Sequence, residues 1–448
     1  MSDASLFAGL FAHGDVAAAV SDRALVDAMV EFEVGLLRAL ALLELAPVEA
    51  ADELSAAVHE GALDLDVAEL GRATGEQGTP VPGLLRALRG QLSASTAAHL
   101  HKGATSQDVV DTAMMLVARR ALDIVLGDLS AAADACASLV SRYRGAIEPG
   151  RTLLQQALPL TFGLKAAGWL AGLDGAVDGL RAARDHDLAL QFGGAVGTLA
   201  SLGDRGLDVS VGLGDQLGLP AAQVPWHTIR LRPARIACAL GAALGVTGKI
   251  GRDVALLAQT EVAEVTEGGP EGRGGSSTMP HKRNPVGAVG LIACAERGPG
   301  LVGTMLAAMA QEHERAAGTW PAEWETLPQL LRLAGSSAAI LSELLGGLEV
   351  DPEKMRDDME LTGGLVMSES VAAALAPALG RADAQDLVER AARRSVQSGV
   401  AFRDVLLELP QVADALGAER LDAALDPSSY LGVTNELIDR ALAAHRAR

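Results

Sequence analysis

Apolar residues recur at the spacing of an amphipathic helix over most of the chain. Long stretches place apolar side chains at positions i, i+3, i+4 and i+7, which brings them to one helical face. The stretches predicted to be helical cover residues 112–144, 161–191, 234–267, 285–314 and 329–345. A helix of about 30 residues is roughly 45 Å long. The pattern therefore predicts an all-α fold built around a bundle of long helices.

Shorter helical segments precede and follow these five stretches. Prolines interrupt them at Pro47, Pro80, Pro82, Pro377, Pro410 and Pro427. We therefore expect a small N-terminal helical domain over residues 1–111, a central five-helix bundle over 112–360 and a small C-terminal helical domain over 361–448. The long helices are apolar around much of their circumference, which indicates partner helices from other subunits.

Composition and charge narrow the classes of protein to which this chain can belong. Of its 448 residues, 49% are hydrophobic, which is enough for a large core. We find no run of 18 or more uncharged apolar residues, so we expect no membrane span. The formal net charge of −20 makes nucleic acid and anionic membranes poor partners.

The N-terminal sequence and the cysteines indicate in which cellular compartment the protein works. The chain has no basic segment before its first apolar stretch, which argues against a secretory signal. Its three cysteines, Cys136, Cys238 and Cys294, are far apart and odd in number, as is typical of a reducing compartment. We therefore expect a cytoplasmic protein.

A polar segment after a glycine-rich loop carries several side chains that can do chemistry. Five of the eight residues from 268 to 275 are glycine, so no helix is stable there. Ser276, His281, Lys282 and Asn284 follow, and the segment ends at Pro285, where a helix can begin and its N–H groups can face an anion. A solvated polar loop is the alternative explanation.

A second polar segment precedes the first long helix and contains His101, Thr105, Ser106 and Asp108. Thr105 or Ser106 can cap the helix, and Asp108 can complement its positive N-terminus. The same hydroxyl and N–H groups can instead hold a substrate carboxylate. Capping is the structural explanation, and the two roles are compatible.

Two more segments contain polar residues that could contact a substrate. Residues 150–157 contain Gln155 and Gln156, for which a solvated helix face is the alternative explanation. Residues 311–328 contain Arg315 among acidic residues and tryptophans, for which a charge cluster at a helix end is the alternative.

Spacings typical of metal or nucleotide sites are missing from the sequence. His99 and His101 are only two positions apart, and no H-E-x-x-H, C-x-x-C or P-loop occurs. No G-x-G-x-x-G lies between a predicted strand and a helix. We therefore expect neither a metal nor a nucleotide cofactor.

Several of these segments resemble a known superfamily. Residues 275–285, Gly-Ser-Ser-Thr-Met-Pro-His-Lys-Arg-Asn-Pro, resemble the signature of the fumarase/aspartase superfamily, and residues 101–108 and 150–159 resemble two of its other blocks. Within the superfamily, the chain is similar to the bacterial 3-carboxy-cis,cis-muconate cycloisomerases at residues 191–195, 225–228, 311–315, 323–328 and 430–432.

The resemblance implies an all-α homotetramer with a twenty-helix core and active sites built from three subunits. It implies no cofactor and a small tricarboxylate substrate, with 4-carboxymuconolactone as product in the protocatechuate branch of the β-ketoadipate pathway. It also implies that Ser276, Lys282, Asn284 and His101 are catalytic. The substrate-binding residues implied are Thr105, Ser106, Gln155, His281 and Arg315.

Positions at which this chain differs from related families help to decide which activity it has. Adenylosuccinate lyases have a His where this chain has Leu153, and a Glu paired with that His where it has Val289. Leucine cannot carry a proton, so the loss of both partners argues against that activity. Many cycloisomerases have His where Gln156 stands, which leaves open whether Gln155 or Gln156 contacts the substrate.

Two rival functions remain. The first is a superfamily lyase that eliminates an amine or nitro group from a substituted succinate to give fumarate. The second is a helical scaffold without activity, against which the joint presence of Ser276, Lys282 and Asn284 argues.

Overall fold

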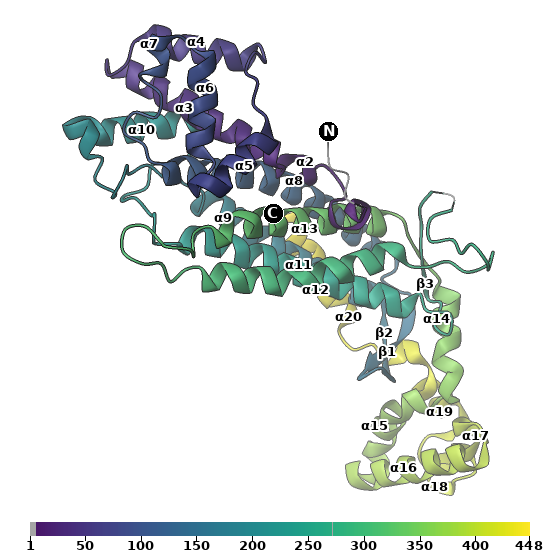
Figure 1. Ribbon diagram of the computed structural model, residues 1–448. Helices are drawn as coiled ribbons and strands as arrows, with labels where there is room; N and C mark the ends of the chain where they lie inside the picture. Colours follow the sequence, from purple (N-terminus) through teal and green to yellow (C-terminus); the bar gives the residue numbers. More distant parts are fainter. Residues whose placement is uncertain (1–5, 271) are drawn as a thin grey trace. The chain divides into compact units, whose positions relative to one another are not determined.

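The computed structural model describes residues 6–270 and 272–448, which are mostly helical, as the sequence predicts (Figure 1). The chain forms two compact units, each assembled from three segments. Unit 1 comprises Met1–Leu129, Ala176–Gly248 and Gly290–Ile340, and unit 2 comprises Ser130–Gly175, Lys249–Val289 and Leu341–Arg448. Because the units cut across chain order, the three-domain division expected from the sequence stays a prediction.

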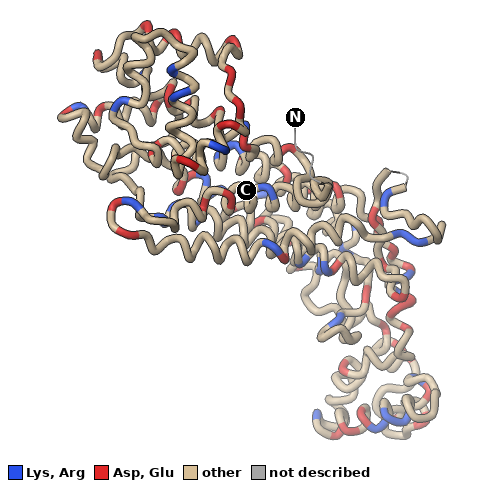
Figure 2. The backbone as a smooth tube through the Cα atoms, in the orientation of Figure 1, with Lys and Arg blue, Asp and Glu red and all other residues tan. Residues whose placement is uncertain are grey.

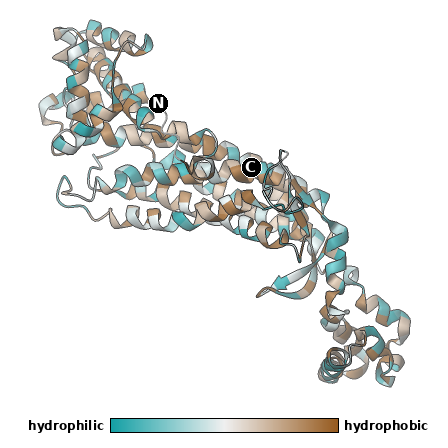
Figure 3. Ribbon diagram, turned by 45° about the vertical axis from the view of Figure 1, so that its right-hand side comes forward, coloured by the Kyte–Doolittle hydropathy of each residue, from teal (hydrophilic) through white to brown (hydrophobic). Residues whose placement is uncertain are grey.

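The five long helices each contribute a stretch to both units. They are α8 (Ser106–Arg142), α9 (Phe162–His186), α11 (Leu231–Leu257), α12 (Val286–Ala307) and α13 (Ala322–Gly346). The longest, α8, has 37 residues. Figure 2 shows charged residues scattered along these helices with uncharged stretches between them, and Figure 3 shows hydrophobic residues recurring along their length.

The ends of the long helices differ from the expected ones because polar contacts and turns decide them. The second helix ends at His186 rather than 191, since the Thr112 hydroxyl donates to the carbonyl of Gln191 (2.9 Å) and accepts from its N–H (3.1 Å). The third ends at Leu257, and part of the remainder is strand β3 (Val265–Glu267). The fifth begins at Ala322, earlier than residue 329, and tolerates Pro328 in its second turn.

Shorter helices complete unit 1. They are α1 (Ala8–Phe11), α2 (Val16–Ala19), α3 (Asp22–Leu42), α4 (Val48–His59), α5 (Val67–Gln77), α6 (Val81–Gln91), α7 (Ala94–Ala97), the 3₁₀ helix η1 (Ala200–Arg205) and α10 (Gly206–Leu217). The Ser21 side chain caps α3 by accepting from the N–H of Ala24. α10 packs closely on α3 at Gly35, where an added Cβ would lie 3.0 Å from Leu217.

Unit 2 contains two small antiparallel sheets and the C-terminal helices. One sheet is the hairpin of β1 (Ile147–Thr152) and β2 (Gln155–Thr161), and the other pairs β3 with β4 (Leu348–Val350). The helices are α14 (Pro352–Met359), α15 (Ser368–Leu379), α16 (Arg381–Ser398), α17 (Phe402–Leu407), α18 (Pro410–Ala415), α19 (Gly417–Leu425) and α20 (Thr434–Arg446), with 3₁₀ helices η2 (Glu360–Thr362), η3 (Leu365–Met367) and η4 (Pro427–Ser429). Phe402, Leu406 and Leu421 lie in the buried core of α15–α19.

Two helices, α8 and α11, are long and apolar enough to cross a membrane by length and composition alone. The bent pair Pro352–Thr362 and Leu365–Leu379, at 81°, passes the same test together. Long helices of a bundle have the same character, because their apolar faces pack on other helices. Helix α8 also buries Asp108 and Asp111 in its first two turns, in the ion pairs described below, which favours a protein core.

Candidate active site

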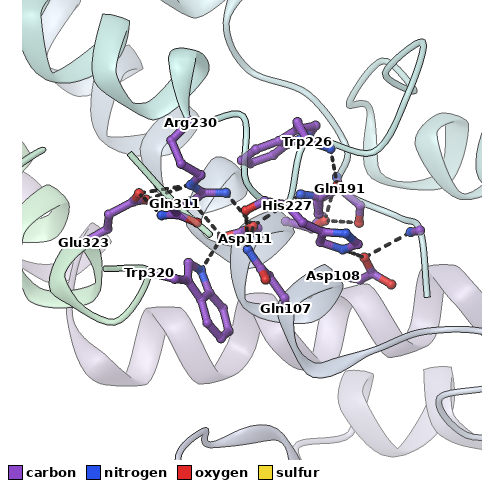
Figure 4. Close-up of polar contacts among 12 residues, drawn as sticks. Gln107, Asp108, Asp111, Gln191, Trp226, His227, Arg230, Gln311, Trp320 and Glu323 are labelled. Carbon is purple, nitrogen blue, oxygen red and sulfur yellow. Dashed lines mark hydrogen bonds and ion pairs between the residues drawn. The ribbon is translucent and has the colours of Figure 1, made fainter. Parts of the chain in front are cut away.

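The N-terminus of α8 is organised around the buried carboxylate of Asp108. This carboxylate accepts from the N–H groups of Thr105 (3.0 Å), Gly193 (3.0 Å) and Gly194 (2.9 Å), and Nε2 of His227 lies 2.7 Å away (Figure 4). The bond from the N–H of Thr105, at the start of α8, to the Asp108 carboxylate is half of a capping box. Asp108 therefore both caps α8 and fixes the loop at residues 193–194.

The hydroxyl of Thr105 has a partner on a different segment from α8. Nη1 of Arg315 donates to that hydroxyl at 2.9 Å. Burial lowers the pKa of the half-buried Arg315, although Asp108 and Asp111 act in the opposite direction. Ser106, the first residue of α8, is partly exposed beside them. A helix N-terminus, two hydroxyl groups and a guanidinium are together suited to hold a carboxylate.

His101 lies in the same unit in a left-handed backbone conformation, with φ of 63°. Its N–H donates to Glu33 (2.9 Å), and its Nδ1 lies 2.8 Å from the other oxygen of that fully buried carboxylate. A carboxylate at Nδ1 fixes the orientation of the ring and leaves Nε2 for a substrate or proton. Glu33 is 68 residues away in the sequence and carries no local signal, so sequence reasoning missed it.

The glycine-rich loop and the polar segment after it belong to unit 2. The N–H and the Nδ2 of Asn284 both donate to the carbonyl of Gly274 at 2.8 Å. Gly274 has φ of +70°, and an added Cβ would lie 2.3 Å from the carbonyl oxygen of Asn284, so only glycine fits there. The hydroxyl of Ser276 accepts from the N–H groups of Thr278 (3.3 Å) and Met279 (3.1 Å).

These two N–H groups favour negative charge on the Ser276 oxygen, which is the condition for a serine to take a proton. His281 and Lys282 are exposed on the same segment. Among residues 6–270 and 272–448, the ammonium of Lys282 makes no hydrogen bond or ion pair, so it can meet an anionic substrate. The loop thus presents the hydroxyl and the cations without burying them.

Gln155 lies just after the tip of the β1–β2 hairpin. The tip residues Leu153 and Leu154 have φ of 51° and 66° and are 96% and 74% exposed. Gln155 is exposed, and its amide donates to the carbonyl of Leu154 at 3.3 Å. The amide of Gln156 instead donates to the carbonyl of Asp358 at 2.8 Å, which favours Gln155 as the residue free to contact a substrate. This segment is a hairpin, so the alternative of a solvated helix face is wrong.

Ion pairs anchor this hairpin at both ends of strand β1. Arg151 donates to both oxygens of Glu264, at 2.9 and 2.6 Å. Burial raises the pKa of Glu148 to about 7, although the ammonium of Lys165, 3.1 Å away, partly offsets that effect. The hairpin is therefore held near its base through Glu148 and close to its tip through Arg151, and the two apolar tip residues project into solvent.

The sequence-predicted residues thus fall in two groups. Thr105, Ser106, His101 and Arg315 lie in unit 1, and Gln155, Ser276, His281, Lys282 and Asn284 lie in unit 2. Within unit 1 the structure joins Thr105 to Arg315, and within unit 2 one loop carries four of the five residues. In the part of the chain that the structure describes, no cluster of three or more His, Cys, Asp or Glu side chains could hold a metal ion.

The long-helix bundle and the serine on a glycine-rich loop are shared with a known family of enzymes, as family models show. The family model described as "Lyase" matches residues 14–298, and the model described as "Adenylosuccinate lyase C-terminus" matches residues 364–441. The chain therefore belongs to the lyase family, and the resemblance to the fumarase/aspartase superfamily is confirmed.

Relatives of known name are similar over the whole chain. The chain is 45% identical to "3-carboxy-cis,cis-muconate cycloisomerase" of Pseudomonas aeruginosa, over 99% of this chain and 96% of the relative. It is 42% identical to "Nitrosuccinate lyase" of Streptomyces davaonensis, over 98% of this chain and 94% of the relative. The crystal structure of 3-carboxy-cis,cis-muconate lactonizing enzyme from Pseudomonas putida superposes with a TM-score of 0.93 and 40% identity, covering 99% of both chains.

Proposed function

We propose that this enzyme interconverts 3-carboxy-cis,cis-muconate and 4-carboxymuconolactone, a step of protocatechuate catabolism. The observation that carries the proposal is the similarity to cycloisomerases over 99% of the chain. The apolar Leu153 at the hairpin tip supports it, since lyases that use a His at this place need a proton carrier there.

In lactonisation, one carboxylate oxygen of the muconate forms a bond to an alkene carbon. The alkene electron pair moves onto the neighbouring carbon and its carboxylate, and a proton from Ser276 then completes that carbon. In reverse, the Ser276 alkoxide takes the proton and the lactone oxygen leaves as carboxylate. The N–H groups of Thr278 and Met279, together with the ammonium of Lys282, stabilise the alkoxide.

The intermediate carries extra negative charge on an enolate-like carboxylate, so fixed donors must meet it. Asn284 binds that developing charge, and His101 is a hydrogen-bonding or secondary proton-transfer residue. The substrate carboxylates are held by Thr105, Ser106, Gln155, His281 and Arg315. The glycine-rich loop closes over the substrate and excludes water.

We further propose a homotetramer in which three subunits form each active site. Exposed apolar residues support it, namely the hairpin tip at Leu153 and Leu154 and, on α12, Val289 and Leu306. Apolar surface of this kind is typical of subunit contacts. Sedimentation showing a stable and active monomer would contradict the tetramer. The three free cysteines support the expectation of a reducing compartment such as the cytoplasm.

The decisive experiment incubates the purified enzyme with 3-carboxy-cis,cis-muconate and follows the loss of the diene's ultraviolet absorbance. We expect the absorbance to fall with the wild-type enzyme and to stay constant with Ser276→Ala. A second arm offers nitrosuccinate and measures fumarate, because a relative named nitrosuccinate lyase is 42% identical. Fumarate release without any change in the diene would establish the substituted-succinate lyase instead.

A further inference from the structure

The segment between α12 and α13 carries Arg315 and contains neither helix nor strand of its own. It is fixed from outside at several points. The hydroxyl of Thr228 donates to the carbonyl of His313 at 2.9 Å, and the amide of Gln311 donates to Glu323 at 3.2 Å. The conformation of this segment therefore depends on side chains from other elements of unit 1.

A buried ion cluster lies behind the segment. The guanidinium of Arg230 donates to both oxygens of Asp111 (2.8 and 3.0 Å) and to both oxygens of Glu323, with a shortest distance of 2.6 Å (Figure 4). The three side chains are only 3%, 3% and 5% exposed. Two carboxylates around one guanidinium leave a net charge of about −1, so the cluster needs further donors.

Trp320 supplies one of these donors from the segment itself. Its Nε1 donates to Oδ1 of Asp111 at 2.9 Å, and its ring meets the ring of Trp324 edge to face with centroids 4.8 Å apart. The guanidinium carbon of Arg315 lies 6.0 Å from the centroid of the Trp320 ring. Trp320 thus contacts the buried carboxylate through its N–H and faces the substrate-binding arginine with its ring, which attracts a cation.

We propose that Asp111, acting through Trp320, is a positioning residue that holds Arg315 over Thr105 at the N-terminus of α8. This inference rests on the proposed function only in treating Arg315 as a carboxylate-binding residue. Arginine has many rotamers, and a carboxylate binds more tightly when the guanidinium is already ordered. The buried carboxylate therefore contributes to substrate affinity although it does not face the substrate.

The test uses Trp320→Phe, which keeps an apolar ring and removes the N–H that binds Asp111. The matched control is Trp169→Phe, which removes the same kind of bond, from Nε1 to Asp253 (2.7 Å), in unit 2. We expect Trp320→Phe to raise KM about 3- to 10-fold with kcat within about twofold, and Trp169→Phe to change neither. A merely structural role predicts that both variants lose stability and that neither changes KM.

A double-mutant cycle tests whether the effect passes through Arg315. In an Arg315→Met background, Trp320→Phe should raise KM no further, because the arginine to be positioned is gone. An equal rise in both backgrounds would overturn the proposal. Kinetics are measured with carboxymuconate or nitrosuccinate, whichever the wild type converts.

A second readout needs no substrate, so it stands even if the proposed function fails. Phenylglyoxal modifies accessible arginines, and peptide mass mapping reports the rate at Arg315. We expect Trp320→Phe to raise that rate several-fold and Trp169→Phe to leave it unchanged. An unchanged rate in Trp320→Phe would refute the positioning role whatever the enzyme converts.

Discussion

The two polar regions of this enzyme are built in opposite ways. At the N-terminus of α8 almost every charge is buried and paired, with Asp108 accepting from three backbone N–H groups and lying beside His227. On the loop from Ser276 to Asn284, His281 and Lys282 are exposed, and the hydroxyl of Ser276 accepts from two backbone N–H groups. The first region is fixed before a substrate arrives, whereas the second presents its groups on a glycine-rich segment.

This difference matches two chemical tasks. Holding a carboxylate requires donors at fixed positions, and burial strengthens their interaction with charge. Delivering a proton requires a group that can approach a carbon after the substrate has bound, which a glycine-rich segment permits. Substitutions in the loop should therefore affect kcat, and substitutions behind the helix N-terminus should affect stability or affinity.

Replacing Ser276 should give the largest effect. Ser276→Ala removes the proposed proton carrier, and we expect kcat to fall by about 10²- to 10⁴-fold while circular dichroism and oligomeric state stay unchanged. Ser277→Ala, at the exposed neighbouring hydroxyl, is the matched control and should keep most of the activity. Near-normal turnover of Ser276→Ala would move the proton role elsewhere, with His101 as the next candidate.

Replacing Arg230 tests how much the buried ion cluster near the N-terminus of α8 contributes to stability. Arg230→Met leaves the carboxylates of Asp111 and Glu323 buried without their cation, and we expect the free energy of unfolding to fall by about 3–5 kcal/mol. Burial already raises the pKa of Glu323 against the pull of Arg230.

The control for that variant is an exposed ion pair. Arg403→Met breaks the contact between Arg403 and Asp422, whose side chains are 45% and 49% exposed, respectively. Because water screens exposed charges, this variant should lower the free energy of unfolding far less than Arg230→Met does. Chemical denaturation at one fixed protein concentration measures both variants. Equal losses would show that the buried cluster has no special role in stability.

Replacing Lys282 distinguishes stabilisation of developing charge, which affects kcat, from substrate binding, which affects KM. Lys282→Met removes a cation that we propose to act when negative charge develops, so we expect kcat to fall by about 100-fold. Lys282→Arg should recover only part of the loss, since a planar guanidinium does not replace a compact ammonium. If steady-state kinetics showed a higher KM with an unchanged kcat, Lys282 would be a binding residue instead.

The smallest effect is expected at the C-terminal helix, outside both regions. Both ring nitrogens of His445 face carboxylates, with Nδ1 2.9 Å from Asp174 and Nε2 3.0 Å from Asp134. Burial lowers the pKa of His445, but the bonds to Asp174 and Asp134 outweigh that effect and raise it above its usual value of 6.5.

A raised folded-state pKa means that the protonated histidine stabilises the fold below about pH 6.5 and that this contribution disappears as the pH rises through the higher folded value. Between pH 5.5 and 8.5 the free energy of unfolding of the wild type should therefore fall further than that of His445→Gln, by at most about 1 kcal/mol. Parallel pH profiles of the two proteins would contradict this assignment.

The sequence by itself determined the helical architecture and much of the candidate chemistry. The 3.6-residue repeat located all five long helices, because periodic apolar positions report which side of a local element is buried. The polar segment from Ser276 to Asn284 was visible because its residues are contiguous and follow five glycines. The hairpin at Leu153 and Leu154 was missed, since neither residue is a usual choice for a turn with positive φ.

Only the tertiary structure decided which charges pair. Glu33 lies 68 residues from His101, and Arg230 lies 119 residues from Asp111 and 93 residues from Glu323. Local periodicity specifies which face of a helix is apolar and therefore buried. A buried charge, in contrast, pairs with whichever oppositely charged group the fold brings within about 3 Å. That choice depends on how segments distant in the sequence meet, and no local pattern of residues encodes it.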